Sequence, residues 1–123
     1  MLTGRCLCGS VTFETEAPPK GASVCHCGQC RRQSGHLWAS AYVPKTELTI
    51  TGKVTWFEAS ETAKRGFCPT CGSFLFWHAP AEDTVSFALG AVDAPTGIHL
   101  EKHIFVASKG DYYDISDALK QRD

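Results

Sequence analysis

The hydrophobic pattern along the chain is that of many short strands. Residues 10–16 alternate polar and apolar side chains and are rich in β-branched residues, which is typical of a strand buried on one face. Comparable short apolar runs recur through the sequence and are separated by glycine, proline and small polar residues. These runs predict further strands over residues 37–43, 48–51, 54–57, 63–67, 74–77, 84–89 and 99–107.

Helical structure is expected only in two brief segments. Residues 28–34 suit a short helix ended by Gly35, because glycine adopts the left-handed conformation that closes a helix. A second short helix is expected to begin at Ser116. Gly52 and Lys53 lie between two predicted strands and indicate a hairpin turn. The sequence therefore predicts an all-β fold, and its length of 123 residues predicts a single domain over residues 1–123.

Composition and charge exclude several classes of protein. The apolar fraction is 43% and the charged fraction 20%, as in a soluble globular domain. No apolar run approaches the roughly 20 residues of a membrane helix, and the N-terminus has no secretory pattern. We therefore expect a cytoplasmic protein without a membrane partner. A net charge of −1 and a single local pair, Arg31 and Arg32, disfavour nucleic acid as a partner.

All seven cysteines fall in three short clusters, which is the distribution of metal sites. A reducing compartment disfavours disulfides, and an odd number of cysteines would leave one unpaired. We call these clusters first, middle and last in chain order. They are Cys6-Leu7-Cys8-Gly9, Cys25-His26-Cys27-Gly28-Gln29-Cys30 and Cys68-Pro69-Thr70-Cys71-Gly72.

Seven thiolates divide naturally into a group of four and a group of three. Four sulfurs close a tetrahedral zinc site, whereas three leave one coordination position free. Spacing leaves two partitions open. In one, Cys27 and Cys30 join the last cluster in an ordinary zinc ribbon. In the other, the first and last clusters share one ion and the middle cluster binds a second, which is simpler because a local trio closes only short loops.

The three motifs resemble those of the glutathione-dependent formaldehyde-activating enzyme family, also called the centromere protein V/formaldehyde-activating domain. The matching segments are Cys6-x-Cys8-Gly9, Cys25-His26-Cys27-x-x-Cys30-Arg31 and Gly66-Phe67-Cys68-x-x-Cys71-Gly72-Ser73. The resemblance covers nearly the whole chain and implies an Mss4-like fold of small antiparallel sheets, a β-tent built around zinc sites. It also implies two Zn²⁺ ions, a structural one on Cys6, Cys8, Cys68 and Cys71, and an exposed one on Cys25, Cys27 and Cys30.

The family's reaction adds glutathione to formaldehyde and gives S-(hydroxymethyl)glutathione, so the resemblance implies a carbon–sulfur lyase with a small thiol and an aldehyde as partners. That step needs a thiolate, a polarised carbonyl and a proton for the new oxygen. Zinc with a free position can hold the thiol as a thiolate or polarise the aldehyde as a Lewis acid. Three cysteine thiolates leave the zinc site at −1, which weakens it as a Lewis acid and favours thiol binding.

Candidate substrate contacts lie close to the clusters in the sequence. Glutathione carries two carboxylates, which arginine binds through paired hydrogen bonds. We therefore expect carboxylate binding by Arg31, Arg32 and Arg65, polar contacts from Gln33 and Ser34, and pocket walls from Trp38, Phe76 and Trp77. No residue identifies itself as the group that transfers the proton.

Other interpretations stay open at this point. The protein could be a noncatalytic zinc-binding module that carries a thiol or binds a protein partner, and the second ion could be structural. His26 or His36 could complete the ligands of that ion. His78, His99 and His103 are expected to be ordinary strand residues, and the tryptophans are core aromatics by default.

Overall fold

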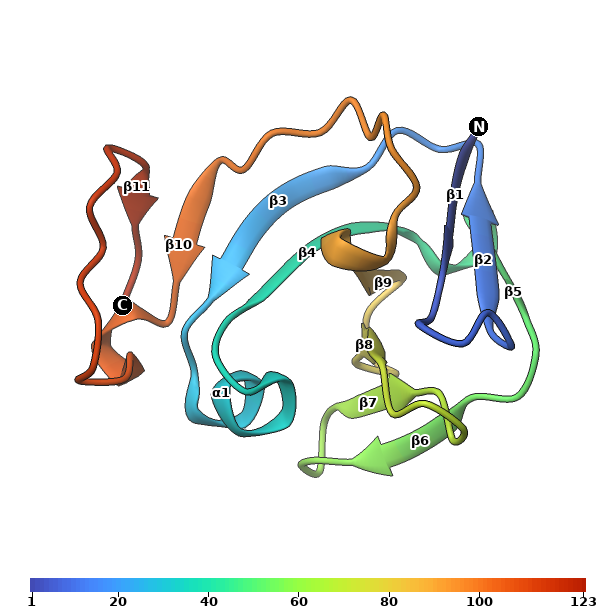
Figure 1. Cartoon of the computed structure of the whole chain (residues 1–123), viewed down its shortest axis with the longest axis horizontal. Helices are drawn as coiled ribbons and strands as arrows, with labels where there is room; N and C mark the ends of the chain where they lie inside the picture. The colour runs from blue at the N-terminus through green and yellow to red at the C-terminus, as the bar shows by residue number, and fades with distance from the viewer.

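A computed structural model describes residues 1–123 and shows two β-sheets. The small sheet is antiparallel with the order β1-β2-β5, and lies beside the N-terminus (Figure 1). The large sheet extends from there to the C-terminal side of the molecule (Figure 1). The strands of the small sheet are β1 (Leu2–Arg5), β2 (Thr12–Thr15) and β5 (Leu48–Thr51).

The large sheet has eight strands in the order β11-β10-β3-β4-β9-β8-β7-β6. Strand β10 pairs in parallel with both of its neighbours, and every other pair is antiparallel. In chain order these strands are β3 (Lys20–Cys25), β4 (Trp38–Pro44), β6 (Thr55–Glu58), β7 (Lys64–Phe67), β8 (Phe74–His78), β9 (Thr84–Ala88), β10 (Lys102–Ile104) and β11 (Lys120–Gln121).

One α-helix, α1 (Gly28–Ser34), follows β3 directly. Its first turn is capped by the sulfur of Cys27, and it ends at Gly35, which has a φ of 90° and donates its N–H to the carbonyl of Arg31. None of the helices has the length and apolar character needed to cross a bilayer. The other helical segments are the 3₁₀ turns Lys45–Glu47, Leu89–Ala91 and Val106–Ser108.

The core lies where the two sheets pack together. Phe13 of β2 makes an edge-to-face contact with Phe76 of β8, with ring centroids 5.4 Å apart, and also contacts Phe87 of β9. Burying each of these rings stabilises the fold by on the order of 2 kcal/mol. Cys6 and Cys68 are buried within the same cluster of side chains, so one pair of cysteine loops is built into the core.

The structure confirms the all-β class and the short helix over residues 28–34. Seven of the predicted strands are present with ends within two residues of the prediction, but β1, β3 and β11 were missed. In β3 the last four residues are all buried, so the alternation of polar and apolar residues that identifies a half-exposed strand is absent. The strand expected over residues 99–107 is confined to Lys102–Ile104.

The predicted hairpin at Gly52 and Lys53 is wrong. Strand β5 pairs with β2 in the small sheet, whereas β6 pairs with β7 in the large one, so the turn carries the chain between sheets. Gly52 has a φ of 100°, and a Cβ there would lie 2.1 Å from the carbonyl oxygen of Ser10. The glycine serves a close crossing of the backbone instead of a two-residue hairpin.

The helix expected from Ser116 is also absent. The carboxylate of Asp117 accepts the backbone N–H of Leu119 at 3.0 Å, which forms a turn that competes with helical hydrogen bonding. The segment then ends in β11, which pairs with β10 at the edge of the large sheet.

Candidate metal centres

Two distant parts of the chain supply one group of four cysteines. The first pair follows β1 of the small sheet, and the second lies between β7 and β8 of the large sheet. All four sulfurs lie within 4.8 Å of one another, with 3.6 Å and 3.7 Å between two of the pairs. Zinc–sulfur bonds of about 2.3 Å give a tetrahedron with edges of about 3.8 Å, so the donors fit Zn²⁺. These residues are Cys6, Cys8, Cys68 and Cys71.

Hydrogen bonds to Cys68 and Cys71 of this group favour the thiolate form of these two cysteines. The hydroxyl of Ser73, 3.2 Å from the sulfur of Cys71, lowers the pKa of that thiol to about 5. The hydroxyl of Ser10, 3.2 Å from the sulfur of Cys68, lowers its pKa to about 7, and the N–H of Thr70 also faces this sulfur at 3.4 Å. Donors aimed at the charged form stabilise it, as a metal ligand requires.

A second group, which we call the trio, consists of Cys25, Cys27 and Cys30. Cys25 ends β3, Cys27 caps α1, and Cys30 lies in its first turn, where its N–H donates to the sulfur of Cys27 at 3.3 Å. The three sulfurs lie within 4.8 Å of one another. The cysteines are thus grouped as four and three, in the partition that keeps each cluster intact, and both groups could hold a metal ion.

The trio's thiols differ in burial and acidity. Cys25 and Cys30 are buried, and Cys27 is half-buried. The hydrogen bond between Cys25 and Cys30, assisted by the guanidinium of Arg65, lowers the pKa of Cys30 to about 6. The same bond, together with burial, raises the pKa of Cys25. Within this pair the surroundings therefore favour the thiolate at Cys30 over the thiolate at Cys25.

Arg65 of β7 is a buried cation beside the trio, with only 4% of its surface exposed. Its Nη1 lies 3.4 Å from the sulfur of Cys30 and 3.4 Å from Oε1 of Gln33. A positive charge here offsets the net −1 that three thiolates and Zn²⁺ would carry. Arg65 also lies in the wall of a cavity, so its expected binding of a substrate carboxylate stays a prediction.

Arg65→Met is expected to make metal retention at the trio more sensitive to acid. Arg65 lowers the pKa of Cys30, so its removal raises that pKa, and protons then compete with the metal at higher pH. The midpoint of metal loss should move upward by about one pH unit, as for loss of a neighbouring opposite charge. Metal content measured against pH checks this, with Arg32→Met as the exposed-charge control. Equal midpoints in both variants would contradict it.

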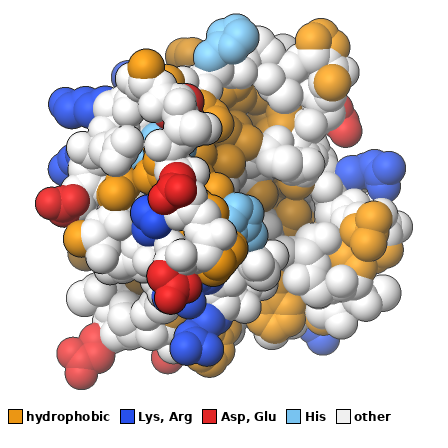
Figure 2. Space-filling view, turned by 60° about the vertical axis from the view of Figure 1, so that its left-hand side comes forward, with side chains coloured by type: hydrophobic (Ala, Val, Ile, Leu, Met, Phe, Trp, Pro, Cys, Tyr) orange, Lys and Arg blue, Asp and Glu red, His pale blue; other side chains and the backbone are white.

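Two cavities are lined in part by residues of α1. The larger of these two has a volume of about 780 Å³, and three of the expected substrate contacts lie in its wall: Gln33, Ser34 and Trp38. The Trp38 ring stacks on Phe74, with centroids 4.1 Å apart. Arg5 of β1 lies in the same wall, and sequence reasoning missed it because only the packing of the two sheets brings it near α1. With the left-hand side of Figure 1 turned forward, the surface is hollowed and apolar side chains lie in the hollow (Figure 2).

The smaller cavity, of about 380 Å³, has Arg32 and Arg65 in its wall. Arg31 lines neither cavity. Phe76 was expected to wall a pocket but is fully buried in the core, and Trp77 packs beside the trio without lining either cavity. The cysteines of the trio also line neither cavity, whereas residues of α1 line both.

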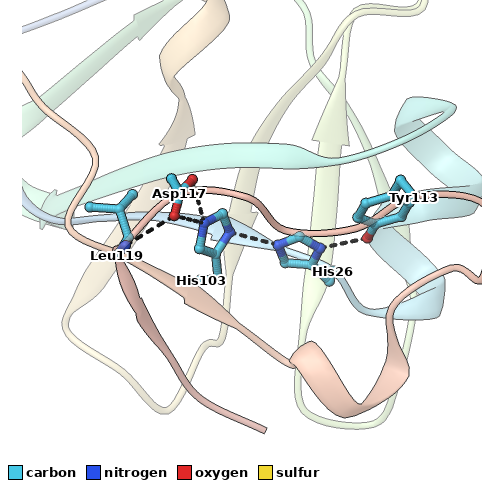
Figure 3. Close-up of polar contacts among 5 residues, drawn as sticks. All are labelled: His26, His103, Tyr113, Asp117 and Leu119. Atoms are coloured by element: carbon cyan, nitrogen blue, oxygen red, sulfur yellow. Dashed lines mark hydrogen bonds and ion pairs between the residues drawn. The ribbon is translucent and has the colours of Figure 1, made fainter.

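The histidines near the trio make other contacts. Nδ1 of His26 lies 2.5 Å from the hydroxyl of Tyr113, and Nε2 lies 2.8 Å from Nδ1 of His103. Nδ1 of His36 lies 2.7 Å from the hydroxyl of Tyr112. Both ring nitrogens of His26 are thus engaged away from the sulfurs. His103, expected to be an ordinary strand residue, belongs to a hydrogen-bond chain whose two imidazoles are buried (Figure 3).

Comparison with known proteins identifies the family of the chain. The sequence profile described as glutathione-dependent formaldehyde-activating enzyme matches residues 1–108. The chain belongs to this family. An uncharacterised lyase of Schizosaccharomyces pombe is 29% identical over 75 residues, which are 60% of this chain and 55% of the yeast protein. The chain thus spans just over half the length of that curated relative.

A crystal structure of a Rhodobacter sphaeroides protein has a similar fold. Its TM-score to this chain is 0.61 at 27% sequence identity, and the match covers 79% of this chain and 90% of the bacterial one. All seven cysteines of this member of the formaldehyde-activating family lie within the matched residues 1–108. Tyr112, Tyr113 and Asp117 lie beyond them.

Proposed function

We propose that this protein promotes the addition of a small thiol, with glutathione the expected one, to formaldehyde or another aldehyde, as a carbon–sulfur lyase. The product is an S-hydroxymethyl adduct. The trio carries this proposal, because three convergent cysteines without a fourth side-chain ligand suit an open site. A zinc ion held there would supply a free position and favour a bound thiol as the thiolate. Family membership and the lyase named in yeast support this chemistry.

The chain's own residues would bind the substrate and balance its charge. Gln33 and Ser34 offer hydrogen bonds in the larger cavity, and Arg5 offers a cation for a carboxylate in the same wall. Arg32 offers a second cation in the smaller cavity. The guanidinium of Arg65, next to Cys30, would offset the negative charge of the thiolates. Two separated cations suit a thiol that carries two carboxylates, as glutathione does.

The four-cysteine group suits a structural zinc ion. It is closed by four sulfurs, joins the two sheets, and has two of its cysteines in the core. We therefore propose two Zn²⁺ ions with different roles. A cytoplasmic location stays a prediction.

A noncatalytic thiol carrier is the second candidate function. Two of the trio's cysteines are buried, and none of the three lines either cavity. This limited access for an aldehyde favours a carrier over an enzyme. A carrier would bind a thiol at the trio without accelerating a reaction.

A panel of aldehydes and thiols tests the proposal. Adduct formation must be measured above the uncatalysed rate, because the reaction proceeds without protein. We expect acceleration with at least one pair, and loss of that acceleration when the trio is emptied while the four-cysteine group stays loaded. No acceleration with any pair, together with a thiol that perturbs only one of two bound ions, would establish the carrier instead.

A further inference from the structure

The segment that follows the family match folds back against the metal-binding stretch. We call residues 109–121 the C-terminal clamp. Tyr113 stacks on His26, which lies between two cysteines of the trio, with ring centroids 5.6 Å apart. Tyr112 bonds to His36, two residues after the end of α1. The clamp thus contacts the loop before the helix and the loop after it.

A chain of hydrogen bonds fastens the clamp to this loop (Figure 3). The hydroxyl of Tyr113 lies 2.5 Å from Nδ1 of His26, whose Nε2 lies 2.8 Å from Nδ1 of His103. Nε2 of His103 lies 3.0 Å from both carboxylate oxygens of Asp117. The N–H of Leu119 donates to the same carboxylate. Both imidazoles are buried, so water does not compete with the bond between them.

The carboxylate gives the chain one direction when both imidazoles are neutral. Ionised Asp117 only accepts hydrogen bonds, so His103 carries its hydrogen on Nε2 and accepts at Nδ1. His26 then donates from Nε2 and accepts at Nδ1 from the hydroxyl of Tyr113. The N–H of Leu119 and the imidazole of His103 hold the pKa of Asp117 below its usual range, and burial lowers the pKa of His26.

These bonds leave His26 little freedom. Both of its ring nitrogens are engaged, and its backbone N–H donates to the carbonyl of Ile104 at 3.1 Å. Because Cys25 and Cys27 are its chain neighbours, holding His26 also holds the directions in which their side chains leave the backbone. Bonds that orient the ligands of a metal typically matter 10- to 100-fold in affinity.

We propose that Tyr113, His103 and Asp117 are positioning residues for the trio, and that the C-terminal clamp strengthens binding of its ion by fixing the loop at His26. The inference rests on the proposed function only in taking the trio as a metal site. Tyr113 and Asp117 lie beyond the residues that the family profile matches. In this chain, residues outside the matched family region would therefore set the metal affinity of the trio.

Two variants alter the two ends of the hydrogen-bond chain while keeping side-chain size. Tyr113→Phe removes the hydroxyl that bonds to His26, and Asp117→Asn replaces the carboxylate, which only accepts, with an uncharged amide that can accept or donate. The matched controls are Asp114→Asn, within the clamp, and Tyr42→Phe of β4. Zinc affinity of each site is measured by competition with a chromophoric chelator at mildly alkaline pH. Nitrogen NMR of the same zinc-loaded samples reports the histidine tautomers, and circular dichroism with retention of the four-cysteine zinc verifies folding.

We expect hydrogen on Nε2 of both His26 and His103 in the unsubstituted protein. In both test variants the trio's zinc affinity should fall about 10-fold, with the four-cysteine site unchanged, and Asp117→Asn should mix the tautomers. The controls should match the unsubstituted protein. Should Asp117→Asn fail to fold, Tyr113→Phe, which loses one oxygen atom, decides.

Unchanged trio affinity in the folded variants would overturn the inference and leave the proposed function standing. The opposite tautomer of His26 in the unsubstituted protein would overturn it as well. Uptake of a single ion by the unsubstituted protein would overturn the proposed function and this inference together.

Discussion

Cys68→Ser is expected to leave the chain largely unfolded at room temperature. The sulfur of Cys68 is buried and lies 3.7 Å from that of Cys8, so it joins the loop after β7 to the loop after β1. A structural zinc site contributes on the order of 10 kcal/mol of folding free energy. The net stability of a whole domain is about 5–15 kcal/mol, so few of the molecules would remain folded. Far-UV circular dichroism, thermal melting and metal analysis measure the outcome.

The exposed Thr70 of the same loop supplies the control, since Thr70→Ser keeps all four sulfurs. It should bind the full complement of metal and melt close to the unsubstituted protein. A cooperative melt of Cys68→Ser near that of Thr70→Ser would show that the four-cysteine group does not hold the sheets together.

Cys27→Ser is expected to abolish binding of the trio's metal ion, which is the ion that should respond to an added thiol. Adduct formation should then fall to the uncatalysed rate, while the fold stays intact. The cysteine is half-buried and belongs to a single local turn, so no contact between sheets depends on it. Its sulfur caps α1 by accepting the N–H of Cys30, and a serine oxygen can accept the same bond. The free energy of unfolding should change by no more than about 1 kcal/mol.

Metal stoichiometry, thermal melting and the adduct assay follow this variant together. Gln29→Ala, an exposed change in the same turn that keeps all three sulfurs, should retain both metals and the stability of the unsubstituted protein. Equal losses of stability in Cys27→Ser and Cys68→Ser would count against an open second site, because an ion that contributes equally to folding is a structural one.

The contrast between these two variants follows from how each group is closed. The four-cysteine group connects segments 60 residues apart, between Cys8 and Cys68, so its ion constrains the whole fold. The trio spans six residues of sequence, from the end of β3 into α1. Emptying it frees only a short turn, which suits a site that exchanges ligands.

Sequence reasoning located the trio and its helix but not the groups that modify them. Arg65 was a candidate because arginine binds carboxylates, yet its contact with Cys30 depends on the tertiary packing that brings β7 to α1. Arg5 gave no signal, because nothing in its neighbourhood marks it as facing a cavity. The role of His103 was missed because its sequence neighbours give no sign of its partners, which are His26 in the loop after β3 and Asp117 in the C-terminal clamp.

The sequence alone determined the local features of this protein. They are seven cysteines in three motifs, a short helix that ends at Gly35, and an all-β class indicated by short apolar runs. These depend on bonds and dihedral angles within a few residues. Only the tertiary structure decided which cysteines converge and that β5 and β6 belong to different sheets. It also decided that Asp117 is linked through His103 to His26, the residue between Cys25 and Cys27. Those outcomes depend on contacts between strands that are distant in the sequence, so no single segment determines them.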